Sequence, residues 1–452
     1  MASASDHHLP AYHVHTSRGY LNDPNGPVEL EGTTHLYFQS RPYPHKDVPV
    51  EWGHASTTDL INWRLHRPAM SPLPGARDAD GCWSGNALVD GSEVHAYYSG
   101  KTAGDTYQSV LRAVSTDGGA SFGPPRQVLA DPLPDEQVTM FRDPFVYRED
   151  DALTMMVGAA RADGSGAIRR YRSTDGISWA YTGDVAGRVR GIVGGEDTGE
   201  GWECPQILPT DAGEIALISS WSFADGVGHV LSFPVGGDAP VVPVPQRVDH
   251  GTSFYAASVM REHSSGSPVL WGWIREARST VAWQDAGWAG AISLPRTAWC
   301  AADGSLRTAP HPAVDALRID TGRPADGARI DGRAEIVVPE GGGAVRIDFG
   351  ADEYCTIDID PDAGIVTLDR SHAAGVDPLD GSRSVAPDAF DASGRPAVRI
   401  FVDGSILEIF TSAGRSVTSR VYPRSAPEWT VHAPAGAVLF DIRRSIEAES
   451  TR

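Results

Sequence analysis

Gly19-Tyr20-Leu21-Asn22-Asp23-Pro24-Asn25-Gly26-Pro27 is the stretch of the chain from which its fold can be worked out. One carboxylate, Asp23, stands between two asparagines and is followed by Pro and Gly, just before an apolar run that begins at Val28. Asn, Asp, Pro and Gly are the residues that turns require, so the stretch alone would suit an ordinary hairpin. A functional interpretation gains weight because acid-bearing segments of the same design recur further along the chain.

Five short β-like runs recur with nearly even spacing. Successive runs start 54 to 62 residues apart, at His35, Val94, Leu153, Ile215 and Val269. A second marker, Ser/Thr-Thr-Asp followed by an aromatic residue, has its acid at Asp59, Asp117 and Asp175, at intervals of 58 residues. A repeat of this length that holds several short strands is typical of a β-propeller blade. We therefore expect an all-β chain in which residues 1–300 form a five-bladed β-propeller.

A second β-rich region is expected after the repeats end near Arg296. Residues 301–326 suit a linker with a short helix at 313–317, and residues 327–452 contain further strand-like alternation. The strongest pattern there is a hairpin from Val398 to Phe410 with Asp403-Gly404 at its turn. A C-terminal β-sandwich with a structural role fits this region.

Composition and charge restrict the partners. A formal charge of −21 and a pI near 5.0 argue against nucleic acid or an anionic membrane and favour a small neutral substrate. The four cysteines are scattered without a Cys-x-x-Cys pair, so neither a zinc site nor a disulfide framework is expected. No run approaches the roughly 20 apolar residues of a membrane helix, and the first residues do not resemble a signal peptide. We expect a cytoplasmic location, and no oligomeric state follows from the sequence.

Three of the five repeats open with an acid. The openings are Asn22-Asp23-Pro24, Trp83-Ser84-Gly85-Asn86, Arg142-Asp143-Pro144, Glu203-Cys204-Pro205 and Ser253-Phe254-Tyr255. Asp23 and Glu203 stand 12 residues before their runs and Asp143 stands 10 before its own. Because equivalent positions on innermost strands surround the centre of a propeller, the three carboxylates should converge there. Taken singly, each acid also suits a turn start, a surface ion pair or a strand edge.

Converging carboxylates beside aromatic residues are the equipment of a glycosidase, in which one acid attacks the anomeric carbon and another protonates the leaving oxygen. Metal binding by the same acids is the competing interpretation. Against it, no histidine lies within two residues of Asp143 or Glu203, and a calcium-loop spacing is missing. We therefore expect no metal and no cofactor.

The chain resembles glycoside hydrolase family 32, the β-fructofuranosidases that include invertases, inulinases, levanases and related fructosyltransferases. The resemblance covers nearly the whole chain. The motifs that carry it are Asn22-Asp23-Pro24-Asn25-Gly26, Trp52-Gly53-His54-Ala55, Trp83-Ser84-Gly85, Arg142-Asp143-Pro144, Glu203-Cys204-Pro205, Phe254-Tyr255-Ala256 and Gly287-Trp288-Ala289-Gly290, with Ser419-Arg420-Val421-Tyr422-Pro423 near the end.

This resemblance implies that Asp23 is the nucleophile, Glu203 the general acid/base and Asp143 a stabiliser of the transition state. It implies substrate-binding roles for Asn22, Gln39, Trp52, Trp83, Ser84, Arg142, Tyr255 and Trp273. The chain departs from the family at Tyr20, where Trp is usual, at Ser253, where Asp is frequent, and at Asn86, where Ser is usual. We expect Tyr20 and Ser253 to face the rim of the site.

The implied activity is retaining hydrolysis that releases terminal β-D-fructofuranosyl residues from sucrose, fructo-oligosaccharides or fructans through a covalent fructosyl-Asp intermediate. Fructosyl transfer at the same site is the alternative, because both reactions share that intermediate. A non-catalytic fructan-binding protein is a third candidate, against which the intact set of acids argues. Sucrose-6-phosphate stays open as a substrate, since Arg41, His45 and Lys46 could meet a phosphate, although loop cations are usually solvated.

Overall fold

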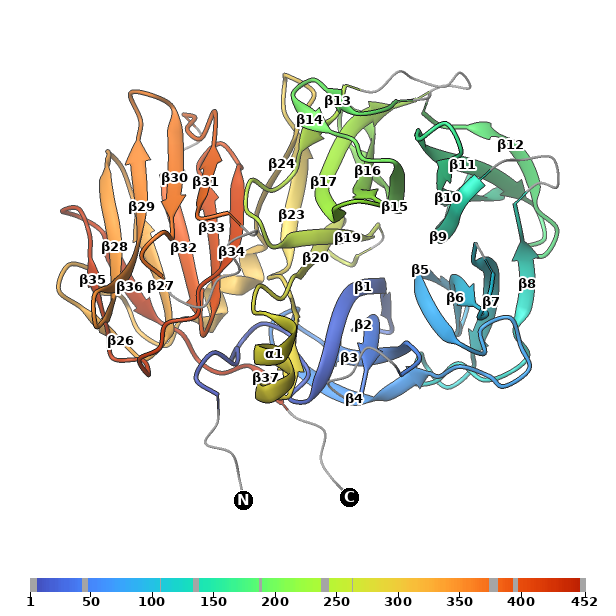
Figure 1. Cartoon of the computed structure of the whole chain (residues 1–452), viewed down its shortest axis with the longest axis horizontal. Coiled ribbons are helices and arrows are strands. Elements are labelled where there is room, and N and C mark those ends of the chain that lie inside the picture. The colour runs from blue at the N-terminus through green and yellow to red at the C-terminus, as the bar shows by residue number, and fades with distance from the viewer. Residues whose placement is uncertain are drawn as a thin grey trace.

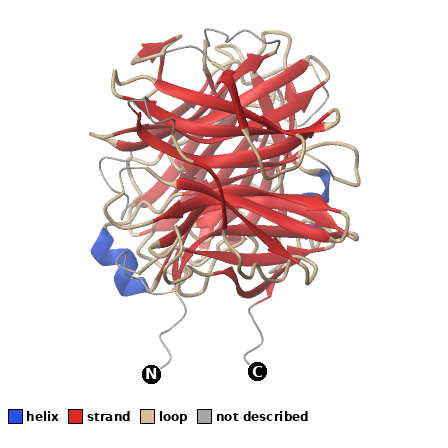
Figure 2. Cartoon of the chain, turned by 90° about the vertical axis from the view of Figure 1, so that its right-hand side faces the viewer, coloured by secondary structure: helices blue, strands red, loops and turns tan. Residues whose placement is uncertain are grey.

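The computed structural model is almost entirely β-structure, as Figure 2 shows, with one α-helix and one 3-10 helix in the part of the chain that it describes. It describes residues 6–42, 48–105, 107–132, 138–186, 189–236, 244–261, 263–373, 381–392 and 397–447. Neither helix of these ranges is long and apolar enough to cross a membrane.

The first part of the chain forms five sheets whose main strands are antiparallel. The first sheet contains β1 (Gly19–Leu30), β2 (Thr33–Arg41), β3 (Glu51–Thr57) and β4 (Trp63–Met70). The second contains β5 (Gly81–Asp90), β6 (Glu93–Lys101), β7 (Ser109–Ser115) and β8 (Gln127–Ala130). The third contains β9 (Val138–Glu149), β10 (Ala152–Arg161), β11 (Gly166–Ser173) and β12 (Ala180–Asp184).

The fourth sheet contains β15 (Gly201–Thr210), β16 (Gly213–Ser222), β17 (Gly226–Val235) and β18 (Gln246–Arg247), and a small hairpin of β13 (Ile192–Val193) and β14 (Glu196–Asp197) precedes it. The fifth contains β19 (Phe254–Met260), β20 (Val269–Ile274), β23 (Arg296–Cys300) and β24 (Leu306–Pro310), with β22 (Ala291–Ile292) paired to β20.

The first strand of each sheet lies nearest a common centre (Figure 1). Contacts run from β1 to β5, to β9, to β15, to β19 and back to β1, so these five strands form a closed ring of neighbours. The five apolar runs of the sequence are the second strands of the sheets, and the Ser/Thr-Thr-Asp markers begin the turns that follow the third strands β3, β7 and β11. The repeat in the sequence is thus a repeat of sheets.

Side-chain amides connect neighbouring first strands. The Asn86 amide donates to the carbonyl of Val146 and accepts from its N–H, both at 2.8 Å, and so joins β5 to β9. Gln206 Oε1 accepts the N–H of Val259 at 3.0 Å and joins β15 to β19. Both β5 and β15 pair only with the second strand of their own sheet. A buried amide can satisfy backbone groups on the edge of a strand that is left unpaired.

A segment of the fifth repeat crosses over to the first sheet. Helix α1 (Thr280–Ala286) begins after Ser279, whose side chain accepts the N–H of Ala282, and ends at Gly287 in the left-handed conformation (φ 83°). The chain then enters β21 (Trp288–Ala289), which pairs in parallel with β1. At the opposite edge of this sheet, β37 (Ile446–Glu447) pairs in parallel with β4.

The segment 301–326, expected to be a linker, is partly regular structure. β24 pairs with β23 along its whole length and completes the fifth sheet, because the side chain of Leu306 is buried in the same cluster as Leu270. The helix expected at 313–317 is the 3-10 helix η1 (Pro312–Leu317), which begins with a proline and is capped by the His311 ring.

The C-terminal part forms two six-stranded antiparallel sheets. One contains, in spatial order, β25 (Arg323–Pro324), β36 (Val438–Asp441), β27 (Arg333–Val338), β32 (Val398–Asp403), β33 (Ile406–Thr411) and β34 (Ser416–Arg420). The other contains β26 (Arg329–Ile330), β35 (Trp429–His432), β28 (Gly343–Gly350), β29 (Glu353–Asp360), β30 (Ile365–Asp369) and β31 (Arg383–Ala386).

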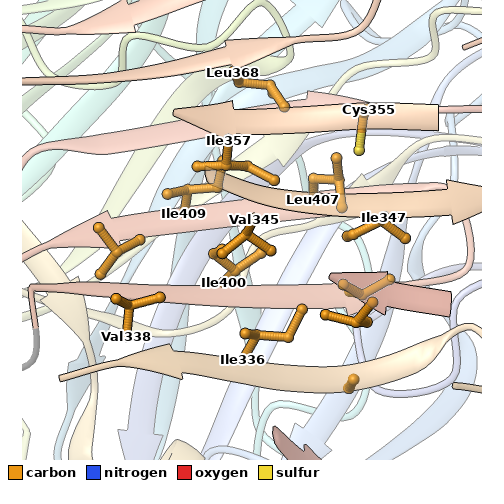
Figure 3. Packing of buried hydrophobic residues seen from close by; sticks show 14 of the residues in the cluster. Ile336, Val338, Val345, Ile347, Cys355, Ile357, Leu368, Ile400, Leu407 and Ile409 are labelled. Atoms are coloured by element: carbon orange, nitrogen blue, oxygen red, sulfur yellow. The ribbon is translucent and has the colours of Figure 1, made fainter. Parts of the chain in front are cut away.

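Aliphatic side chains from these two sheets form one core, in which Ile336 and Ile400 come from the first sheet and Val345 and Ile357 from the second (Figure 3). The expected hairpin is β32 and β33. Its two turn residues are Gly404, with φ at 59°, and Ser405, whereas Asp403 still pairs with Ile406 as part of the ladder. The turn therefore lies one residue later than the expected Asp403-Gly404.

Asp403 ties the C-terminal sheets to the start of the chain. Its carboxylate accepts the backbone N–H groups of Ala11, Tyr12 and His13 at 2.7 to 3.0 Å. The His13 ring lies between two carboxylates, with Nδ1 2.9 Å from Asp403 and Nε2 2.9 Å from Glu408. Burial alone would lower the pKa of His13, but these two hydrogen bonds raise it above its ordinary value.

Glu408 continues the network into the fifth sheet. It accepts the N–H of Leu294 at 2.9 Å and binds the Arg296 guanidinium, which also donates to Asp249 at 2.9 Å. Asp249 in turn accepts the N–H and the hydroxyl of Thr418 at 2.8 and 2.7 Å. These side chains are fully buried, so the charges depend on one another for compensation.

We expect Glu408→Ala to lower the free energy of unfolding by about 3–5 kcal/mol, because it leaves His13 and Arg296 buried with one partner fewer. Urea unfolding followed by fluorescence measures the change. The matched control is Glu428→Ala, which removes a 3.7 Å ion pair with Arg329 whose partners are 83% and 74% exposed. That control should cost less than about 1 kcal/mol. Equal losses in the two variants would contradict a dominant role for the network.

Candidate active site

All five first strands leave regular pairing at the same place. The pairing of β1 with β2 is interrupted between Leu21 and Pro24, where Asp23 lies. Corresponding interruptions fall between Cys82 and Gly85, Arg142 and Phe145, Glu203 and Gln206, and Tyr255 and Ser258. Such bulges bend a strand and redirect its side chains. The acid-bearing segments are therefore bulges inside strands, and the hairpin interpretation of residues 22–26 is wrong.

Three of the bulges contain a non-glycine residue in the left-handed region, Asp143 (φ 62°), Cys204 (φ 46°) and Ala256 (φ 48°). This conformation is uncommon for residues with a Cβ and costs free energy. Pro144 and Pro205 follow two of these residues, and proline is tolerated there because a bulge needs no ladder hydrogen bond from it. The Asp-Pro and Cys-Pro pairs in the sequence thus mark the strained points that turn side chains toward the centre.

Asp23 is held by neutral donors from two sheets. Its Oδ2 accepts from Ser84 Oγ at 2.6 Å and from Gln39 Nε2 at 3.0 Å, and its Oδ1 accepts from Asn22 Nδ2 at 3.2 Å. Burial raises the pKa of Asp23 to about 6, with a further contribution from the charge of Glu203, while the hydrogen bonds oppose the rise. Above that pH the carboxylate is an anion with a fixed orientation.

Asp143 lies deeper and is almost fully buried. Its Oδ2 accepts the N–H of Cys204 at 3.1 Å, and its Oδ1 accepts from Ser99 Oγ at 3.3 Å. The Cys204 thiol lies 3.6 Å from Asp143 Oδ2 and 3.9 Å from Asp23 Oδ2, so it stands between the two acids. Burial raises the pKa of Asp143 to about 7, and the charges of Glu203 and Asp23 add to this while Arg142 opposes it.

Glu203 has one neutral and one charged partner. The Tyr255 hydroxyl donates to Oε2 at 2.6 Å, and the Arg142 guanidinium forms an ion pair with Oε1. The Glu203 side chain is 14% exposed, so solvent and ligands can reach it. Arg142 itself lies between two indoles, with its Cζ 5.7 Å from the ring centre of Trp83 and 5.4 Å from that of Trp221.

The structure places the predicted binding residues at different depths. Asn22, Gln39 and Ser84 touch Asp23, whereas Arg142 and Tyr255 touch Glu203. Trp83 is half-buried over Arg142.

Trp52 is fully buried and donates its Nε1–H to the Trp83 carbonyl at 2.9 Å. Trp273 is buried against Tyr255 and Tyr20. Trp52 therefore contacts Trp83, and Trp273 contacts Tyr255, from buried positions.

Two expectations about the rim are wrong. Tyr20 is buried against the rings of Trp273 and Trp283, so it belongs to the packing behind β1. Ser253 is fully buried, and its N–H donates to the Thr418 carbonyl at 3.0 Å, at the junction with the C-terminal sheets. Of the cations considered for a phosphate, Arg41 lies 5.8 Å from the ring of Tyr20, while His45 and Lys46 lie outside the described residues.

Sequence reasoning missed Ser99, the contact of Cys204 with two acids, and Trp221. A signal was present, because Gln39, Ser99 and Trp221 each follow the apolar run of their repeat within a few residues. Those positions are near the ends of second strands β2, β6 and β16, which lie beside the bulges of β1, β5 and β15. The second strand therefore contributes to the site as regularly as the first.

A separate cavity lies among the later halves of four first strands. Its lining includes Val28, Leu88, Val146 and Met260, and it contains none of the three candidate acids. Asn86 also borders it. The candidate site and this cavity are thus different places along the same ring of strands.

Known proteins with related sequences and structures share this architecture. Residues 13–310 match the Glycosyl hydrolases family 32 N-terminal domain, and residues 306–444 match the Glycosyl hydrolases family 32 C-terminal domain. The chain is 28% identical to a raffinose invertase of Escherichia coli, over 96% of this chain and 94% of that protein. It is 27% identical to a sucrose-6-phosphate hydrolase of Bacillus subtilis, over 92% and 89% of the two chains.

Among solved structures, a β-fructofuranosidase of Bombyx mori, determined as a mutant in complex with sucrose, superposes with a TM-score of 0.79. That similarity covers 98% of this chain and 95% of the other, at 25% identity.

We expect Asp23→Asn to be more stable than the wild type above pH 6. The folded-state pKa of about 6 exceeds the ordinary value of 3.8, so the wild type loses stability as pH rises between these values. Asparagine does not titrate, and the variant should gain about 3 kcal/mol at pH 8 and little at pH 4. Thermal melts across this range measure the difference.

Asp59→Asn provides a control of opposite sign. Burial tends to raise the pKa of Asp59, but hydrogen bonds from Asn62, Ile61 and Thr57 lower it overall, so this carboxylate stabilises the fold above pH 4. The control should therefore melt below the wild type at pH 8. A lower melting temperature for Asp23→Asn at pH 8 would contradict the electrostatic cost assigned to Asp23.

Proposed function

Because the chain belongs to glycosyl hydrolase family 32 and is therefore a glycosidase, we propose that it is a retaining β-fructofuranosidase that releases terminal fructosyl groups from sucrose and related fructans. The observation that carries the proposal is the convergence of Asp23, Asp143 and Glu203 from three sheets, with hydrogen bonds that give each acid a different environment. A small neutral sugar suits a site without a free excess of positive charge.

In the first step, Asp23 attacks the anomeric carbon of the fructosyl group. The bond between that carbon and the leaving oxygen breaks as the fructosyl-Asp23 ester forms. Ser84, Gln39 and Asn22 fix the carboxylate for this attack. Their neutral character matters, because a cation bonded directly to Asp23 would weaken it as a nucleophile.

Glu203 donates the proton that the leaving oxygen needs, and in the second step its carboxylate takes a proton from water. That water attacks the anomeric carbon and frees Asp23. Tyr255 and Arg142 hold both oxygens of Glu203, so its orientation survives the change of charge. Asp143 would accept hydrogen bonds from fructosyl hydroxyls and oppose the positive charge of the oxocarbenium-like transition state.

The same proposal extends to the architecture. We assign the ring of five sheets as a five-bladed β-propeller that carries the site, and the two C-terminal sheets as a β-sandwich. Because β24 completes the fifth sheet, the first domain would end near Pro310, and not at residue 300. We also assign a cytoplasmic location.

Fructosyl transfer is the second candidate activity. It needs an acceptor sugar in place of water. The half-buried indoles of Trp83 and Trp221 lie against Arg142, the ion-pair partner of Glu203, and offer apolar surface where an acceptor could lie. Chromatography of the products from sucrose, inulin and levan separates the two activities. Free fructose from each substrate supports hydrolysis, and oligosaccharides longer than the substrate support transfer.

We expect Asp23→Ala and Glu203→Ala to lower kcat by about 10³-fold or more, because each removes a group that changes bonding during the reaction. Azide, which needs no general base, should partly restore turnover of an activated fructoside by Glu203→Ala. Asp211→Ala, an exposed acid in the turn between β15 and β16, is the control and should retain wild-type kinetics. Wild-type rates in either acid variant would remove the proposed roles.

We expect the first fructose released to have the β configuration. Two successive inversions at the anomeric carbon restore the starting stereochemistry, and this mechanism places the two carboxyl groups about 5–5.5 Å apart. Proton NMR recorded immediately after mixing, before mutarotation, identifies the anomer. Initial α-fructose would mean that water attacks directly and that Asp23 forms no ester.

A further inference from the structure

We propose that Trp221 and Phe223 form a platform for the leaving-group sugar, so that this glycosidase favours fructosides whose leaving group is itself a sugar. The inference rests on the proposed function and deepens it. It assigns a role to an aromatic pair on the second strand of the fourth sheet and the turn after it, outside the predicted set of binding residues.

The pair lies on the side of the site where the leaving group must be. In the ladder of β15 and β16, Gly201 faces Trp221 and Glu203 faces Ser219. Because side chains alternate along a strand, Trp221 lies on the same face of the sheet as Glu203. The Trp221 ring also packs on the guanidinium of Arg142, which is bound to Glu203. The group that protonates the leaving oxygen is therefore next to Trp221.

Backbone contacts hold the segment that carries the pair. The N–H of Phe223 donates to Glu200 Oε2 at 2.8 Å, and the N–H of Glu200 donates to the Trp221 carbonyl at 2.8 Å. Gly199 (φ 64°) approaches so closely that a Cβ there would lie 2.4 Å from the Trp221 carbonyl oxygen. The two rings meet edge to face with their centres 4.6 Å apart. A fixed aromatic pair binds a ligand with little loss of side-chain entropy.

Packing inside the protein accounts for the position of Trp221 but not for that of Phe223. Trp221 covers Arg142, whereas Phe223 contacts Trp221 edge to face and leaves 61% of its own surface exposed. Phe223 is linked to the proposed general acid through Trp221 and Arg142. Its exposed phenyl ring presents apolar surface, and the C–H faces of a pyranose or furanose ring pack on such surfaces. The only cation beside the pair in these contacts is Arg142, which is already engaged by Glu203, so a neutral sugar suits the platform better than a phosphorylated one.

The test compares two substrates that share the fructosyl group and differ in the leaving group, sucrose and methyl β-D-fructofuranoside. In Phe223→Ala, the ratio of kcat/KM for sucrose to kcat/KM for the methyl fructoside should fall about tenfold, because only sucrose carries a sugar that reaches the ring. Phe223→Leu, which keeps apolar bulk without the flat face, should give an intermediate ratio. Ile319→Ala, at a side chain that is 63% exposed in the segment before the C-terminal sheets, is the control and should leave the ratio unchanged.

The outcomes separate the inference from the proposed function. An unchanged ratio in Phe223→Ala, with wild-type melting behaviour, overturns the platform and leaves the β-fructofuranosidase assignment intact. Failure of the wild type to hydrolyse either substrate overturns the assignment and the platform together. A fall in the ratio confined to the two Phe223 variants supports the platform.

Discussion

The free edges of the five first strands impose the constraint on which the remaining structure depends. Apart from the short pairing of β1 with β21, each of these strands pairs only with the second strand of its own sheet, and its other edge turns toward the next sheet, where backbone groups still need hydrogen-bond partners. Asn86 and Gln206 supply them by joining the first strand of one sheet to that of the next. Both amides follow directly after a bulge, so the same short segment that redirects a side chain also aligns two sheets. Convergence of the acids is a consequence of that alignment.

Gathering the acids costs stability. Burial raises the pKa of both Asp23 and Asp143, and the negative charge of Glu203 adds to each rise. Asp143 and Cys204 also have strained backbone conformations. The site tolerates these costs because neutral donors surround Asp23 and a backbone N–H holds Asp143. Groups whose environments differ in this way can take different parts in acid and base chemistry.

The C-terminal sheets contribute to the site through contacts at a distance from it. Their buried carboxylates bind the start of the chain at His13 and the fifth sheet at Arg296. Tyr422, which follows the last strand of one sheet, donates to Glu276, and Glu276 pairs with Arg278, which binds the carbonyl of Trp288 in β21. Because β21 pairs with β1, this chain of contacts reaches the strand that carries Asp23. The structural role expected of the C-terminal region stays a prediction, and these contacts are the connection through which it would act on the site.

Much of this protein was determined by local sequence. The spacing of the apolar runs indicated five equivalent units, and the Asp-Pro and Cys-Pro pairs marked the acids, because a bulge leaves its signature in a few adjacent residues. Only the tertiary structure decided which aromatic residues are exposed. Tyr20 proved to be buried, and Trp221 proved to lie over Arg142, which pairs with Glu203, since these outcomes depend on residues from other sheets. Ser253 is likewise buried, at the junction with the C-terminal sheets. The pairing of β21 with β1 and the return of β37 to β4 were likewise beyond local reasoning. Such pairings join residues hundreds of positions apart, and a two-residue strand is too short to have a periodic pattern from which it could be predicted.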